Sequence, residues 1–277
     1  MPRHVRALFL TLFCALVTSG CLTSVTTIKV KPDGSGTIEQ SMAMKAEAAA
    51  QFAAMASTFG DADRKDGKSN EPPELFTEKD LREAATKFGE GVTFVSSEPI
   101  KTKDLVGRRA TYAFADITKV RVNQKPPSPK GAPGEGDSTK PADDVAFRFL
   151  HNPGGTSVVT VVFPEPDFSK KKEKDTESGT ESKKLDPAQL AMMKKMLDGL
   201  RIEIALEVAG AIVKTNSAYV QGSKVTLLEM DFAELMNNDA ALEKLSNPES
   251  LEEAKQMLKG VKGVKVNLDR EVSVEFK

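Results

Sequence analysis

The stretch Val25-Thr-Thr-Ile28-Lys-Val30-Lys31 alternates apolar and polar residues, which is the pattern of a β-strand with one buried face. Pro32-Asp-Gly-Ser-Gly36 follows with residues that favour a tight turn, and alternation returns in Thr37-Ile-Glu-Gln-Ser-Met42. Two alternating runs joined by a short turn predict a β-hairpin.

Two periodic patterns describe the rest of the chain: alternation, as in a strand, and a spacing of three or four residues, as in a helix. Alternation predicts further strands at 92–95, 107–114, 146–149, 157–163, 201–208, 224–230 and 264–276, and we expect 117–122 to extend the sheet. Apolar residues three or four apart predict helices at 43–59, 77–88, 186–200, 232–245 and 247–260. The sequence therefore predicts an α+β fold, in which antiparallel β-hairpins form a sheet and several amphipathic helices pack on one face.

Two segments interrupt this pattern. Residues 124–142 and 169–184 are rich in Pro, Gly, Ser and charged residues and contain almost nothing to bury, so both are predicted to be disordered inserts. They divide the chain into an N-terminal α+β part at 21–123 and a C-terminal α+β part at 143–277.

The first twenty residues have the composition of an export signal. Met1–Arg6 is basic, and Ala7–Val17 is apolar but, at a rise of about 1.5 Å per residue, is too short to cross a hydrocarbon core of about 30 Å. Residues 1–20 are therefore predicted to be a signal peptide.

The segment Thr18-Ser19-Gly20-Cys21 resembles the lipobox of bacterial lipoproteins, although it has Thr18 where the family favours leucine. The resemblance implies cleavage between Gly20 and Cys21 and acylation of Cys21. Because Cys14 is lost with the signal peptide, Cys21 is the only cysteine of the mature chain, and acylation accounts for a thiol that would otherwise be unpaired. In enteric lipoproteins, an aspartate directly after the cysteine is a signal for retention in the inner membrane. This chain has Leu22 at that position, so the resemblance implies that the protein is anchored at the periplasmic face of the outer membrane, where the cell has one.

The composition excludes some classes of function. The chain has 39 basic and 40 acidic residues, no Trp and only 2 Tyr, so it has neither the basic excess of a nucleic-acid-binding protein nor the aromatic platforms that stack on bases. No cofactor is expected.

No segment of the sequence has all the residues that a metal-binding or catalytic motif requires at its fixed positions. Asp33–Glu39 copies the middle of an EF-hand loop, but the first and twelfth positions would be Lys31 and Met42, so a hairpin turn is favoured. His151 is the only histidine outside the signal peptide, and it precedes a turn where a solvated position is expected. The chain is therefore predicted not to be an enzyme.

Two groups of segments resemble stretches of bacterial envelope lipoproteins. The first is Phe88–Thr93 with Tyr112–Thr118, and the second is Val208–Ala218 with Gly222–Thr226. The second group is similar to LppM-like lipoproteins, although Leu227-Leu228 stands where that family has a tryptophan. The resemblance implies a β-rich exported domain with helices and implies no catalytic residues.

These observations predict a membrane-anchored, non-enzymatic binding or interaction module of the cell envelope, with an envelope protein or a lipid as its partner. A lipid or other apolar-ligand carrier is the first alternative, and an atypical hydrolase built on His151 or a carboxylate pair is the second. For the carrier, helical spacing places the side chains that would line a ligand cavity at Phe52, Met55, Met192, Met193 and Met196.

Overall fold

The computed structural model describes residues 22–50, 77–124, 144–152, 154–164, 199–236, 251–258, 260–267 and 269–277. These residues form one sheet of eight strands and one of five strands. Within the described ranges, no helix is both long enough and apolar enough to cross a membrane.

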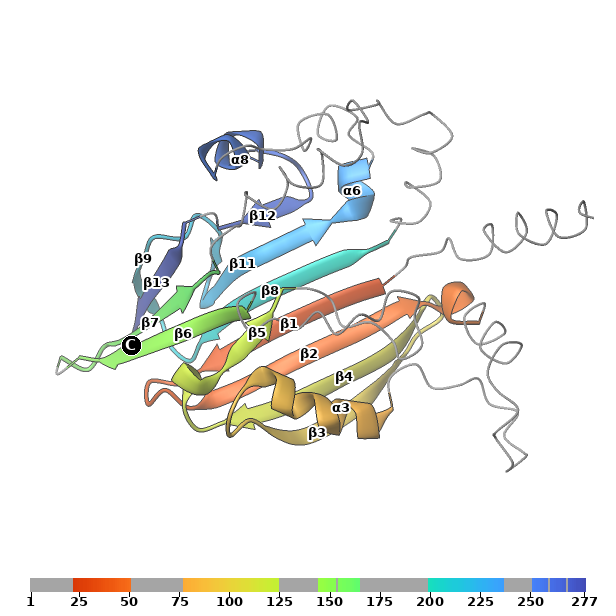
Figure 1. Ribbon diagram of the computed structural model, residues 1–277, viewed down its shortest axis with the longest axis horizontal. Coiled ribbons are helices and arrows are strands. Elements are labelled where there is room, and N and C mark those ends of the chain that lie inside the picture. Colours follow the sequence, from red (N-terminus) through yellow and green to blue (C-terminus); the bar gives the residue numbers. More distant parts are fainter. Residues whose placement is uncertain are drawn as a thin grey trace, which may run out of the picture.

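Strand β1 (Leu22–Val30) lies near the middle of the eight-stranded sheet, as Figure 1 shows. It pairs with β2 (Gly36–Lys45) in the antiparallel sense and with β8 (Arg201–Val208) in the parallel sense. The sheet continues beyond β2 with β4 (Leu105–Phe114) and β3 (Thr93–Lys101), and beyond β8 with β11 (Lys224–Asp231), to which the short strands β10 (Val220–Gln221) and β12 (Val264–Val266) are paired.

Alternation along these strands gives the large sheet two faces of opposite character. On the core face, Ile28 lies opposite Ile38 of β2 and Leu206 of β8, and all three side chains are fully buried. On the other face, Lys29 lies opposite Glu207. A shift of one residue in either pairing would exchange the two faces, so the apolar pattern specifies the register.

The five-stranded sheet covers part of the core face. Its strands, in spatial order, are β5 (Arg121–Asn123), β6 (Asp144–His151), β7 (Ser157–Val162), β13 (Glu271–Phe276) and β9 (Ile212–Thr215). Figure 1 shows this sheet at one end of the larger one, and side chains such as Val159, Val274 and Phe276 share a hydrophobic core with Ile28 and Leu206. Burial of these side chains between the sheets is the main favourable term in folding.

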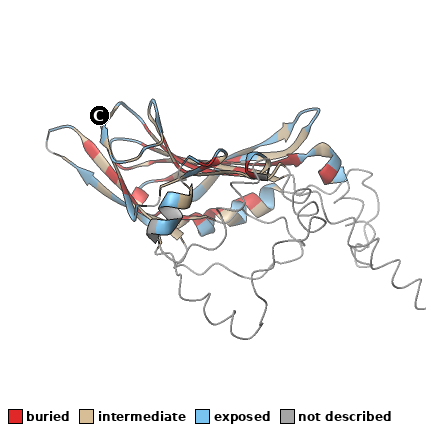
Figure 2. Ribbon diagram, turned by 90° about the horizontal axis from the view of Figure 1, so that it is seen from above, coloured by how far each residue is buried: buried red, intermediate tan, exposed pale blue. Residues whose placement is uncertain are grey.

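The described helices are short. Helix α3 (Glu78–Ala84) begins at Thr77, whose hydroxyl accepts a hydrogen bond from the backbone N–H of Asp80, and continues as η1 (Ala85–Phe88). The ring of Phe88 lies 4.8 Å from the ring of Tyr112 on the core face. In Figure 2, α3 and α8 lie on the same side of the large sheet. The other helical segments are η2 (Ile117–Lys119), α6 (Phe232–Met236), α8 (Leu251–Leu258) and residues 46–50.

The predicted α+β class is wrong, because the described chain consists mainly of β-strands. The face that the prediction assigned to amphipathic helices is covered in part by a second β-sheet, whose alternating valines supply the same apolar surface. The sheet is also not purely antiparallel, since β1 and β8 run in the same direction. Residues 117–122 do not extend the large sheet, because η2 interrupts them and β5 joins the smaller one.

Several predicted elements are confirmed. The β1–β2, β3–β4 and β6–β7 hairpins and the helix that begins at Thr77 lie where the sequence places them. The signal peptide at 1–20, the insert at 169–184 and the insert at 124–142, apart from Gln124, lie outside the described residues. The parts at 21–123 and 143–277 share both sheets, since β1 pairs with β8 and β5 pairs with β6.

Gly36 provides a test of the β1–β2 hairpin. A Cβ atom at this position would lie 1.9 Å from the backbone oxygen of Lys29 and 2.7 Å from the Phe114 ring, so the backbones of β1 and β2 would have to separate. We expect Gly36→Ala to lower the free energy of unfolding by about 2 kcal/mol or more, measured by urea denaturation. Gly154→Ala is the control, since nothing lies within 4 Å of its Cβ, and an equal loss in both variants would contradict this close approach.

Candidate functional site

The sites predicted from the sequence lie outside the described residues. They are the cleavage and lipidation positions Gly20 and Cys21 and the possible ligand-lining residues Phe52, Met55, Met192, Met193 and Met196. The structure does describe the residue that follows Cys21, because β1 begins at Leu22. Leu22 lies opposite Met44, and Thr23 lies opposite Ala43 and Arg201, so the chain is part of the sheet from the position next to the predicted lipid.

The face of the large sheet opposite the core is polar, and in Figure 2 this side carries no described helix. We name it the polar face. Cross-strand pairing places a hydroxyl, charged or small side chain at nearly every position, and Lys29 Nζ contacts Glu39 Oε1 at 2.7 Å between β1 and β2. Its members include Thr23, Thr27, Lys29, Thr37, Glu39, Ser41, Arg109, Thr111, Glu203, Glu207, Lys224, Thr226, Glu229 and Lys265.

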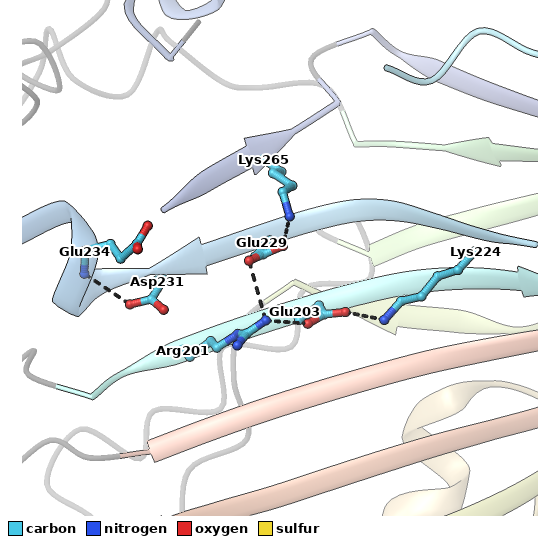
Figure 3. Close-up of polar contacts among 7 residues, drawn as sticks. All are labelled: Arg201, Glu203, Lys224, Glu229, Asp231, Glu234 and Lys265. Carbon is cyan, nitrogen blue, oxygen red and sulfur yellow. Dashed lines mark hydrogen bonds and ion pairs between the residues drawn. The ribbon is translucent and has the colours of Figure 1, made fainter. Parts of the chain in front are cut away.

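A network of five charges crosses three strands of the polar face (Figure 3). Arg201 Nη2 contacts Glu203 Oε2 at 3.1 Å and Glu229 Oε1 at 3.5 Å. Lys224 Nζ lies 2.6 Å from the other oxygen of Glu203, and Lys265 Nζ lies 2.7 Å from the other oxygen of Glu229. Cations and anions therefore alternate along the network, in the order Lys224, Glu203, Arg201, Glu229 and Lys265.

The pairing of the strands explains why this network is needed. Glu203 and Glu229 lie directly opposite each other on β8 and β11, and two like charges in that position destabilise a sheet. The side chains of the two acids are only 9% and 16% exposed, whereas those of the three cations are 35% to 48% exposed. Arg201 bridges the acids, although its Nε is buried and finds no hydrogen-bond partner in the described part of the chain. The carboxylates are thus held in fixed positions beneath partly exposed cations.

The core face contains a second unusual group, which we name the buried polar row: Ser24, Thr26 and Gln40. Thr26 lies directly opposite Gln40, and Ser24 is two residues earlier on β1. All three are less than 8% exposed. The row therefore supplies polar groups to the core face of the sheet.

Tyr112 lies near the buried polar row, two residues after Ala110, which is opposite Gln40. Its hydroxyl is buried and has no hydrogen-bond partner among the described residues, and desolvation raises the pKa of Tyr112 to about 12. The phenol is therefore neutral at physiological pH and can donate a hydrogen bond.

The structure places His151 at the exposed end of β6, with its Nδ1 2.9 Å from Ser157 Oγ. The Ser157 hydroxyl donates to the Pro32 carbonyl at 2.7 Å, so Nδ1 must act as the donor toward the serine oxygen. Ser157 is also fully buried. The pair therefore does not have the arrangement of a nucleophile and its general base.

The calcium-like segment forms the turn between β1 and β2. Ser35 donates hydrogen bonds to Asp33 Oδ1 from its hydroxyl, at 2.7 Å, and from its backbone N–H, at 2.9 Å, and these bonds hold the pKa of Asp33 below its usual range. Among the described residues, no group of three or more His, Cys, Asp or Glu side chains is placed to hold a metal ion. The Asp33 carboxylate therefore stabilises the turn.

Neither the charge network nor the buried polar row was predicted from the sequence. Alternation in 201–208 could have placed Glu203 and Glu207 on one face of a strand, because the period is visible in the sequence. The partner Glu229 depends on the register between β8 and β11, which changes at a bulge between Thr226 and Leu228.

Glu203 tests the contribution of the charge network. Replacement by Gln removes the charge that faces both Arg201 and Lys224, and we expect the free energy of unfolding to fall by about 1 to 2 kcal/mol, because water can still reach both cations. Glu207→Gln, two residues along the same face, is the matched control and should change the free energy by less than about 0.5 kcal/mol. Urea denaturation measures both, and equal losses would show that the network does not stabilise the sheet.

Comparison with known proteins identifies no family for this chain. No protein-family model matches it, and no curated protein matches it. Among solved structures it is similar to the NMR structure of the folded domain of LppM from Mycobacterium tuberculosis, with 11% sequence identity and a TM-score of 0.30, over 94% of this chain and 91% of that chain. That TM-score is too low to assign a shared fold.

Proposed function

We propose that this protein is an exported lipoprotein, anchored in a membrane of the cell envelope through an acylated Cys21, that acts as a non-enzymatic binding module. The position of β1 carries this proposal. The predicted mature chain begins at Cys21, and the large sheet begins one residue later at Leu22. A signal peptide that ends at Gly20 would be removed without loss of any strand residue. By analogy with enteric lipoproteins, Leu22 after the cysteine favours the outer membrane.

The polar face is the surface that we propose for a partner protein of the envelope. It presents charges at fixed positions, because Glu203 and Glu229 are each held by two cations. Such fixed charges favour partners with complementary potential and disfavour others.

A membrane extraction experiment tests both parts of this proposal. Wild-type protein and Cys21→Ser are expressed from their own signal sequence, each with a photo-crosslinking residue in place of Thr27 at the centre of the polar face. We expect an acyl mass on Cys21 that is absent from the variant, together with a discrete crosslinked adduct in the wild type, both measured by mass spectrometry.

The control carries the crosslinker in place of Leu150, which is 60% exposed on β6 of the other sheet. A mature chain with no acyl mass would contradict the anchor. An acylated chain that crosslinks equally from positions 27 and 150, or from neither, would contradict the polar face as the binding surface.

Carriage of a lipid or another largely apolar ligand is a second candidate, and the buried polar row favours it. Ser24, Thr26 and Gln40 supply polar groups on a face that also carries apolar side chains such as Met42 and Ile204. A ligand with an apolar body and a small polar group would satisfy both kinds of surface.

Native mass spectrometry of protein extracted gently from its membrane tests this candidate. We expect a bound ligand on the wild type and roughly tenfold weaker retention by Gln40→Leu, because one hydrogen bond to the ligand would be lost. Thr37→Leu, on the same strand but on the polar face, is the control. Wild-type protein without any bound mass would refute a carrier function.

A further inference from the structure

The end of the large sheet at which β1 begins also brings together residues from other strands. Register places Leu22 level with Met44 of β2, Met44 level with Val106 of β4, and Val106 level with Lys101 of β3. In Figure 1 the start of β1 and the connection between β3 and β4 lie at the same end of the sheet. We name this end, with the turn 101–105 between β3 and β4, the anchor end.

The turn at the anchor end is well defined. The backbone N–H of Thr102 donates to the Leu105 carbonyl at 2.8 Å, and the backbone N–H of Leu105 donates to the Thr102 hydroxyl at 3.0 Å. The Asp104 carbonyl accepts a further bond, at 2.9 Å, from the N–H of Ala46, which follows β2. The turn is therefore tied to the neighbouring strand and holds a fixed place at the end of the sheet.

The chemistry of this turn matches an anionic lipid surface. Lys101 and Lys103 are exposed, and neither forms an ion pair with another residue in the described part of the chain. Asp104 is the one acid of the turn, which leaves the turn with a net positive charge. Leu105 follows with a partly exposed apolar side chain, so basic and apolar groups lie side by side as they do in protein segments that contact membranes.

The short distance between Cys21 and the sheet determines how close the turn 101–105 lies to the membrane. Consecutive Cα atoms are about 3.8 Å apart, so an acylated Cys21 would leave Leu22 almost at the lipid headgroups. Since Leu22 and Thr23 are already paired within the sheet, no tether separates the lipid from the folded domain. Lys101 is three strands away from Leu22, or roughly 14 Å at a spacing of about 4.8 Å per strand.

We propose that the anchor end docks directly on an anionic membrane leaflet, with Lys101 and Lys103 contacting lipid phosphate groups. This inference rests on the proposed acylation of Cys21. It orients the molecule, because Val30 at the other end of β1 then lies about 26 Å farther from the bilayer, at roughly 3.3 Å per strand residue. The polar face consequently stands upright on the membrane and is open to a partner from the side.

A fluorescent label at the turn tests the orientation. Full-length lipidated protein carries Asp104→Cys, which keeps both lysines, and is reconstituted in vesicles with about one-third anionic phospholipid. Since Cys21 is the only other cysteine of the mature chain and is blocked by its lipid, the label is unique. We expect nitroxide-labelled headgroups to quench a label at 104 severalfold more than a label at Gly154→Cys, in the turn between β6 and β7.

Equal quenching at the two positions would overturn the docking. Intact-mass measurement of the same samples distinguishes failure of the proposed anchor from failure of the proposed docking. A chain without acyl mass contradicts the proposed anchor, whereas an acylated chain with an unquenched label at 104 contradicts only the docking.

A charge reversal tests the lysines themselves. Lys101→Glu with Lys103→Glu, in the labelled background, should lose most of the extra quenching in anionic vesicles, since each lysine near such a surface changes binding roughly fivefold. Lys31→Glu with Lys214→Glu has the same change in net charge away from the turn and should retain it. Quenching that is unchanged in the first variant, or lost equally in both, would refute a specific contact between these lysines and lipid phosphates.

Discussion

Strand β1 is paired along its length on both sides, antiparallel with β2 and parallel with β8, and the two registers must agree. Ile28 can be buried only if Ile38 and Leu206 point to the same face, and this condition is met. A slip of one residue between β1 and β2 would turn Ile38 away from the core, and a slip between β1 and β8 would turn Leu206 away from it. The composition of the two faces of the large sheet follows from this double pairing.

On the polar face, the strand register brings two like charges together, and neighbouring cations offset their repulsion. Once β8 and β11 are in register, Glu203 and Glu229 must oppose each other. Arg201 lies between them, and Lys224 and Lys265 complete the neutralisation from outside. Because the cations remain partly hydrated while the acids are nearly buried, the network is less costly than a fully buried ion pair would be. It also leaves a pattern of fixed charges on an open surface, which is suited to recognition.

The same strand connects the fold to its proposed place in the cell. A lipoprotein with a long tether can turn freely above its membrane, whereas a domain whose sheet begins one residue after the lipid cannot. Orientation is then a property of the sheet. In the proposed arrangement, one end of the sheet carries the anchor and the lysines of the β3–β4 turn, and the polar face runs away from the membrane. A partner would meet this face in one orientation, which reduces the entropy lost on binding.

The sequence by itself determined the local elements: the β1–β2 hairpin, the turn around Asp33 and the capped helix at Thr77, all of which depend on neighbouring residues. It placed the first strand from Val25, and only the structure shows that β1 already begins at Leu22, next to Cys21. It did not reveal the parallel pairing of β1 with β8, because the two strands are far apart in the chain and each shows only its own alternation. For the same reason it assigned helices to a core face that β6, β7 and β13 help to cover. The opposition of Glu203 and Glu229 and the burial of Gln40 were decided by tertiary structure alone, since register and burial are properties of strands that the sequence does not place side by side.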